Sequence, residues 1–318
     1  MSEWGGGRGP RDWALVERFL LADLDERRRA RRWRRVRWLI LLVLFGLFIW
    51  SLCRDEKASN SFGPHTAMVT LTGEIADGEP ANADSLIDSL DSAFENSDSK
   101  AVILAINSPG GSPVQADLVN REIWRLRAKY PKKPIYAVIS DMGASGAYYV
   151  AVAANRIYVN PSSLVGSIGV IMPGYGVPGL MQKLGVEDRT LTAGAHKNLL
   201  SPTRPVNPEE REHVQGVLDA VHRQFIAAVK AGRGSRLKND PDMFSGYFWS
   251  GDQAIALGLA DDVGSVDSVA RDVVREDNLV DYTETPSSLD VMLRKMGAEL
   301  GDGVRNGIGL SLDGMQLR

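Results

Sequence analysis

The sequence has little of the chemistry that builds cross-links and metal sites. Its 318 residues include one cysteine and four histidines. A single cysteine, Cys53, excludes an intrachain disulfide framework, and the scattered histidines lack the spacing of a zinc site. We therefore expect neither a metal nor a cofactor. The body of the chain also lacks repeats and low-complexity segments, and its 44% hydrophobic content is enough for a sizeable core.

Acidic residues are missing from residues 27–37, which hold eight arginines and precede the apolar run Trp38 to Cys53. That run has 16 residues, fewer than the roughly 20 that a bilayer core requires, but Val36 and snorkelling arginines extend it. The positive-inside rule keeps the arginines cytoplasmic and places everything after residue 54 across the membrane. The small-residue pattern of a cleavable signal peptide is absent around Cys53, so we predict an uncleaved signal anchor.

Charge is divided unevenly along the chain. Residues 1–54 contain 12 basic and 6 acidic residues, and the remainder contains 25 basic and 34 acidic ones. An acidic body suits neither nucleic acid nor an anionic membrane surface, and the adjacent apolar run disfavours a nucleic-acid-binding arginine arm. We predict a cytoplasmic basic tail (1–37), a transmembrane anchor (38–53), a linker (54–64), a folded domain (65–282) and a partly mobile extension (283–318).

The domain shows apolar runs that alternate with helical patterns, which predicts an α/β fold with a mainly parallel sheet. Continuous apolar strands fit burial on both faces of that sheet. We expect strands at 68–71, 101–106, 135–139 and 156–159, and helices at 83–94, 114–129, 145–154 and 208–231.

Ser145 follows an expected strand and stands at the start of an expected helix. Its neighbours are small: Gly143, Ala144, Gly146 and Ala147. They leave the hydroxyl open to a substrate backbone, as at strained nucleophile turns, and the helix N-terminus favours developing negative charge. Close helix–strand packing requires small residues equally, so the turn alone does not identify a nucleophile.

The segment Asn107 to Pro113 contains a pair of glycines between another strand and helix. Ser112 is the expected N-cap, Pro113 the first helical residue and Gln115 the capping-box partner. Gly110 and Gly111 can turn two adjacent N–H groups into a cleft, as an oxyanion hole requires. A plain glycine turn explains the loop taken alone equally well.

A single lysine, Lys197, stands among small and apolar residues in segment 191–202. An exposed lysine is the ordinary expectation. A lysine that acts as a base near neutral pH needs a pKa roughly three pH units below 10.4, which corresponds to about 4 kcal/mol. Burial among Leu199, Leu200 and the small residues can supply that bias, since no acid lies between Asp188 and Glu209. Such a base would have to be buried.

Four motifs together resemble the signal peptide peptidase A family of membrane-anchored serine–lysine peptidases, over roughly residues 65–282. They are Ser-Pro-Gly-Gly (108–111), Gly-Ala-Ser-Gly-Ala-Tyr-Tyr (143–149), Gly-Ser-Ile-Gly-Val (166–170) and Gly-Ala-His-Lys (194–197), in the family's order. One departure is Ala147, where the family usually has a second glycine.

The resemblance implies spiralled ββα units of the crotonase and Clp-protease type. It implies Ser145 as nucleophile, Lys197 as general base, Ser167 as a hydroxyl that orients the lysine, and oxyanion donors at Gly110, Gly111 and Gly146. The implied activity is degradation of remnant signal peptides and other apolar unfolded segments, outside the bacterial inner membrane. Because this chain carries one copy of a domain that relatives carry in tandem, we expect a homo-oligomer, an octamer, with Ser145 and Lys197 of one site from different subunits.

A histidine triad is the alternative mechanism. His65 lies in an expected linker, and His213 and His222 lie on a long charged helix where solvated histidines are usual. His196 neighbours Lys197, but adjacent residues of an extended segment point to opposite faces. We therefore favour the dyad. A catalytically silent scaffold of the same fold is the alternative function, and a crotonase-like acyl-CoA enzyme is disfavoured because an exported domain meets no CoA.

Overall fold

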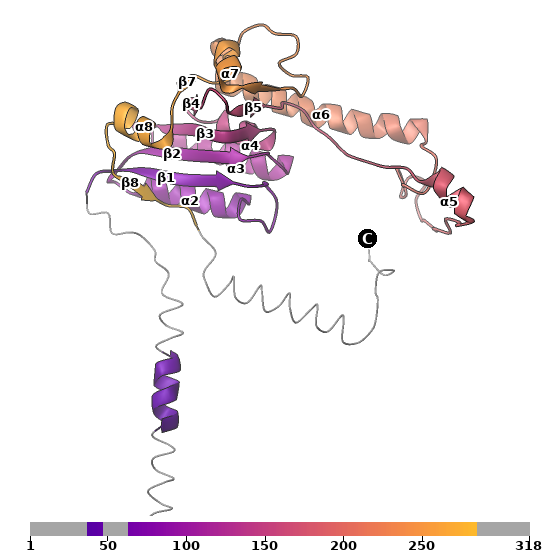
Figure 1. Ribbon diagram of the computed structural model, residues 1–318, viewed down its shortest axis with the longest axis horizontal. Helices are drawn as coiled ribbons and strands as arrows, with labels where there is room; N and C mark the ends of the chain where they lie inside the picture. The colour runs from indigo at the N-terminus through magenta and orange to yellow at the C-terminus, as the bar shows by residue number, and fades with distance from the viewer. Residues whose placement is uncertain (1–36, 47–62, 285–318) are drawn as a thin grey trace, which may run out of the picture. The chain divides into compact units, whose positions relative to one another are not determined.

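The computed structural model describes residues 37–46 and 63–284 (Figure 1). The chain divides into two compact units, 1–57 with 286–318, and 58–285. In the first unit, residues 37–46 are helical and exposed. Within the two described ranges, no helix is both long and apolar enough to cross a bilayer. The rest of the predicted anchor, most of the basic tail and of the C-terminal extension, and nearly all of the linker lie outside the described residues.

The second unit is built on a sheet of eight strands. Neighbouring strands run in the order β6-β5-β3-β2-β1-β8, and β4 pairs with β3 and with β7. All pairs are parallel except β5–β6. This confirms the predicted mainly parallel sheet in a mixed α/β fold. The strands are β1 (His65–Thr72), β2 (Ser99–Ser108), β3 (Ile135–Ala144), β4 (Arg156–Val159), β5 (Leu164–Gly166), β6 (Phe248–Ser250), β7 (Asp262–Val263) and β8 (Leu279–Asp281).

The predicted helices are present, with one clear difference in length. The helix that follows Ser145 ends at Ala151 instead of the predicted residue 154, because Val152 caps it and the chain turns toward β4. The α-helices are α2 (Ala83–Glu95), α3 (Pro113–Lys129), α4 (Gly146–Ala151), α5 (Pro178–Leu184), α6 (Pro208–Arg233), α7 (Gly251–Leu257) and α8 (Val266–Ser268). A 3-10 helix, η1 (Gly234–Arg236), and a π-helix, η2 (Val269–Val274), complete the set.

Alternate residues of the central strands enter two apolar clusters. Val102, Leu104 and Ile106 of β2 join the large core that α2, α3 and α4 cover. Ile103, between them, points to the other face and meets Val269 of η2. Both faces of β2 are therefore buried, which explains its continuous apolar sequence. Burial of each such side chain contributes about 1.5–3 kcal/mol.

Residues 171–206, which we call the arm, leave the sheet after β5 and return through α6. The arm includes α5 and extends away from the sheet toward the far end of α6 (Figure 1). Its backbone bonds are internal, as between the Val177 amide and the Pro202 carbonyl. Ile171, Tyr175 and Leu191 are 84%, 88% and 96% exposed. The arm thus presents apolar side chains that no part of the described chain covers.

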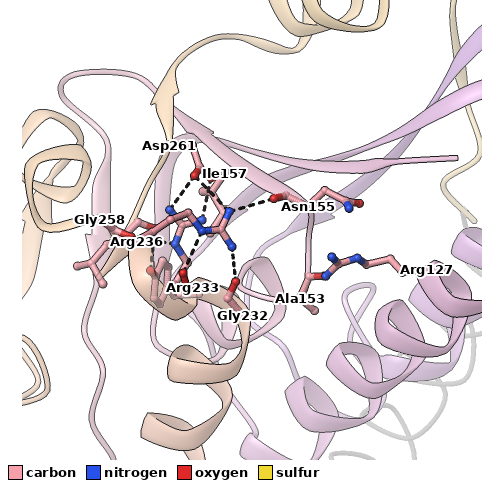
Figure 2. Close-up of polar contacts among 11 residues, drawn as sticks. Arg127, Ala153, Asn155, Ile157, Gly232, Arg233, Arg236, Gly258 and Asp261 are labelled. Carbon is pink, nitrogen blue, oxygen red and sulfur yellow. Dashed lines mark hydrogen bonds and ion pairs between the residues drawn. The ribbon is translucent and has the colours of Figure 1, made fainter. Parts of the chain in front are cut away.

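The other end of α6 is fixed by a buried ion cluster (Figure 2). Arg233, 1% exposed, makes two hydrogen bonds of 2.7 and 3.0 Å to Asp261 and a third to the Gly258 carbonyl. Arg236 also reaches Asp261, which accepts a bond from the Ile157 amide as well. Burial would raise the pKa of Asp261, but the Arg233 hydrogen bond and the other partners together lower it. This cluster ties the C-terminal end of α6 to β4.

Candidate active site

Ser145 occupies a strained turn between β3 and α4, as the sequence predicts. It is the N-cap of α4 and has φ 53° and ψ −125°, which non-glycine residues rarely adopt. Such a conformation costs on the order of 1–3 kcal/mol and is concentrated at functional sites. The side chain is half-buried, and its Oγ forms no hydrogen bond to any described residue. The turn therefore presents an uncommitted hydroxyl at a helix N-terminus.

The glycines around Ser145 are needed for packing as well as for access. A Cβ on Gly143 would lie 2.6 Å from Ile139 Cδ1, and one on Gly146 would lie 3.2 Å from the Gly111 nitrogen. Ala147 is fully buried. The small residues therefore allow α4 to pack closely on β3 and place no bulky side chain next to the Ser145 hydroxyl.

The glycine loop lies directly against the Ser145 turn. A Cβ on Gly110, whose φ is 97°, would lie 2.5 Å from the Gly146 nitrogen and 2.8 Å from Ser145 Cβ. Gly111 is held by Ile75, whose amide donates to the Gly110 carbonyl and whose carbonyl accepts from Ser112. Only glycine fits at these positions, because a side chain would collide with backbone atoms.

The amides of this loop differ in their partners. The Gly110 amide donates to Ser108 Oγ at 3.1 Å. Neither the Gly111 amide nor the Gly146 amide has an acceptor in the described part of the chain. The Gly146 Cβ position lies 3.2 Å from the Gly111 nitrogen, so these two unpaired donors are close together beside Ser145. An arrangement of this kind can bind a negatively charged oxygen.

The cap of α3 differs from the prediction in one bond. Ser112 is the N-cap and accepts from the Gln115 amide at 3.4 Å, as expected. The Gln115 side chain, however, accepts from the Ala83 amide at 2.6 Å and does not return to Ser112. The predicted capping box is therefore wrong, because the Ser112 amide is already bonded to Ile75. Gln115 instead joins the start of α3 to the start of α2.

Ser167 stands beside Ser145 across the β3–β5 pair. The Ser145 amide donates to the carbonyl of Gly166 at 2.8 Å, and Ser167 is the next residue. Ser167 also has a positive φ, 51°, and its amide donates to the Tyr247 carbonyl. Its Oγ has no hydrogen-bond partner within the described ranges. Two adjacent turns thus carry uncommitted serine hydroxyls.

Lys197 lies in the arm and is exposed, so the burial that a lysine base needs is not present in a single chain. Residues 195–200 form turns, and the predicted extended segment is wrong. The apolar neighbours Leu199 and Leu200 are each 38% exposed. Within one chain, the arm leads away from the sheet that carries Ser145 (Figure 1).

The histidines are placed differently from the expectation, except for His213, which is exposed. His65 is fully buried as the first residue of β1, and its Nε2 lies 3.0 Å from the Tyr282 hydroxyl. His222 is half-buried, with Nε2 3.0 Å from the Ile168 carbonyl, and is not solvated. His196 lies 3.4 Å from Glu210. None of the four makes a hydrogen bond to Ser145 in the described structure.

A strained serine between a strand and a helix, with two unpaired amides beside it, is an arrangement typical of serine hydrolases. Sequence comparison identifies the family. The profile of peptidase family S49 matches residues 127–280. A putative protease of Methanocaldococcus jannaschii, MJ0651, is 31% identical over 88% of this chain and 93% of its own length. The chain belongs to peptidase family S49, a family of serine peptidases, which confirms the resemblance.

Two further relatives show how length varies around this domain. A putative signal peptide peptidase SppA of Enterococcus faecium is 30% identical over 72% of this chain and 67% of its own length. A Na(+)/H(+) antiporter NhaA of Brucella melitensis is 43% identical over 57% of this chain. The chain spans only 25% of the length of that antiporter protein.

Sequence reasoning missed two features of the domain, the Arg233–Asp261 cluster and the position of Trp249 beside this site. Buried charges of opposite sign far apart in sequence leave no periodic signal. Trp249 lies on β6, three residues long, whose pairing with β5 places the indole against Gly166. The Phe-Trp-Ser-Gly segment marks a helix start but does not by itself show what the indole contacts.

Proposed function

We propose that this chain is a membrane-anchored serine endopeptidase that uses Ser145 as nucleophile and Lys197 as general base. The observation that carries the proposal is the strained, uncommitted Ser145 beside the unpaired amides of Gly111 and Gly146. Ser145 Oγ attacks the peptide carbonyl carbon and gives its proton to the neutral lysine amine. The two amides stabilise the resulting oxyanion. The lysine ammonium then protonates the leaving amine, and water hydrolyses the acyl-enzyme.

The base in this proposal comes from a second copy of the chain. Lys197 is exposed on an arm whose apolar side chains are also exposed, so one subunit has an incomplete site. Burial of the arm against a neighbour would cover those side chains and remove the lysine from water, which favours the neutral amine. We therefore propose a ring-like homo-oligomer, an octamer, with Ser167 of the Ser145 subunit contacting the incoming lysine.

The proposed substrates are remnant signal peptides and other apolar unfolded segments. The proposed location is the outer face of the bacterial inner membrane, with residues 38–53 as a single span and the N-terminus inside. The arginines of residues 27–37 support that orientation. A reporter fused after Arg318 should be active only outside the cytoplasm, and activity inside would overturn the orientation.

Covalent labelling of the full-length protein in membranes tests the chemistry. A fluorophosphonate probe should label Ser145, and Ser145→Ala should remove the label without changing the oligomer size. The alternative, a catalytically silent scaffold, predicts no labelling of the wild-type protein although the oligomer forms. Cleavage of an apolar reporter peptide by the Ser145→Ala protein would show that another residue is the nucleophile.

A further inference from the structure

The indole N–H of Trp249 is the single buried side-chain polar group without a hydrogen-bond partner in the described ranges. An indole N–H can only donate, so it requires an acceptor to be satisfied. Buried donors without acceptors are rare in folded proteins because they lose water and gain nothing in return. The isolated chain therefore carries a donor whose acceptor is missing.

This donor lies at the site described above. Trp249 pairs with Val165 of β5, and its ring lies over Gly166. A Cβ on Gly166 would be 3.0 Å from Cδ1 of the indole and 3.6 Å from Nε1. The same Gly166 accepts the Ser145 amide and precedes Ser167. The unpaired N–H of Trp249 thus lies next to Gly166, and the unpaired hydroxyl belongs to the following residue, Ser167.

Two titratable groups are in contact with this turn. On α6, His222 contacts the Ile168 carbonyl with Nε2 at 3.0 Å. On the strand side, the Tyr247 ring stands edge-on to the indole, with centroids 6.4 Å apart. Neither of these groups is the acceptor of the Trp249 N–H.

We propose that Trp249 is a positioning residue of this site: its indole N–H donates to Ser167 Oγ in the assembled enzyme, and the Ser167 proton then points to the Lys197 amine. The inference rests on the proposed function of Ser145 and Lys197. A neutral amine has a lone pair that accepts this proton, whereas an ammonium has none. This series of hydrogen bonds, from Trp249 through Ser167 to Lys197, therefore favours the neutral form of the lysine and sets the pH at which the enzyme becomes active. Trp249 does so without contacting the substrate.

The test measures the rate of fluorophosphonate labelling of Ser145 against pH in the full-length oligomer. Trp249→Phe should label about tenfold more slowly at pH 7, and its half-maximal rate should move up by about one pH unit. Trp249→Phe should lower the melting temperature by no more than Trp124→Phe lowers it. Trp124, on α3 beside Arg127, is the matched control and should keep the wild-type pH profile. In a His222→Gln background, Trp249→Phe should shift the pH profile by the same amount as it does in the wild-type background.

A second variant separates the N–H from the shape of the ring. Benzothienylalanine, placed at position 249 alone, keeps the two fused rings and lacks the N–H, and it should reproduce the Trp249→Phe profile. In a Ser167→Ala background, Trp249→Phe should have no further effect on the pH profile, because the acceptor is gone.

Three results would overturn the inference. If Trp249→Phe keeps the wild-type rate and pH profile, the N–H has no role and the proposed function still stands. If Trp249→Phe is slow but benzothienylalanine is not, the ring acts by shape alone. If the wild-type protein is not labelled at Ser145, the proposed function itself fails and this inference with it.

Discussion

The backbone amide of Ser145 donates to the Gly166 carbonyl over 2.8 Å, which joins the Ser145 turn to the turn that carries Ser167. Both serines have φ near 50°, a backbone conformation that is unfavourable for residues other than glycine. The hydrogen bond between the two turns helps to hold both in this conformation. A change at either turn is therefore expected to reach the other.

The backbone strain at Ser145 can be measured by comparing a substitution that relieves it with one that keeps it. We expect Ser145→Gly to be inactive yet more stable than Ser145→Ala, because glycine adopts φ 53° without the penalty that alanine pays. The difference in unfolding free energy should be about 1 kcal/mol, measured by denaturant titration. Ser145→Ala should also lower peptidase activity by several orders of magnitude. Equal stability of the two variants would contradict a strained turn.

The glycine loop provides a test of the proposed oxyanion donors. Gly110→Ala would place a methyl group 2.5 Å from the Gly146 nitrogen, so the two loops must separate. We expect loss of fluorophosphonate labelling together with a stability loss of about 1–3 kcal/mol. Gly216→Ala on α6 is the control, because nothing lies within 4 Å of its added carbon. It should leave labelling intact and stabilise the helix by roughly 0.5–1 kcal/mol.

Subunit mixing tests where the base comes from. Ser145→Ala and Lys197→Ala should each be inactive, and oligomers that contain both should recover part of the wild-type activity, because some sites then hold an intact pair. Lys197→His should not recover activity alone, since an imidazole is shorter than the lysine side chain. Absence of recovery in oligomers shown to be mixed would place both residues in one subunit.

The Arg233–Asp261 cluster predicts a pH-dependent stability. Asp261→Asn leaves Arg233 buried without its charge partner and should cost about 3–5 kcal/mol of unfolding free energy at pH 7. The folded-state pKa of Asp261 is below the ordinary 3.8, so its contribution is complete above that pH and is lost as the pH falls through the folded value. The stability gap between wild type and variant should therefore narrow below about pH 4. A gap that stays constant on acidification would contradict this assignment.

Strands and helices of the domain were predictable because the apolar residues of β2 and β3 form continuous runs and the helix starts carry clear caps such as Asn207. The Ser145 turn was also predictable, since a cluster of small residues between an apolar strand and a helix start lets the chain turn sharply. The position of Lys197 on an arm that leads away from the Ser145 sheet (Figure 1) was not predictable, because sequence pattern cannot show which surface an apolar segment packs against. The burial of His65 was missed for a similar reason: Tyr282, its partner, lies 217 residues away.

The pairing of His65 with Tyr282, the residue after β8, links the first strand of the domain to the end of its last strand, at one border of the sheet. The polypeptide thus enters and leaves the domain at the same border, and β6 stands at the opposite one, beside the Ser167 turn. A tether attached to either end of the domain therefore applies its force to the border formed by β1 and β8. Force on the chain ends is therefore carried by strands that hold none of the proposed catalytic residues, and the turn at Ser145 is spared the load.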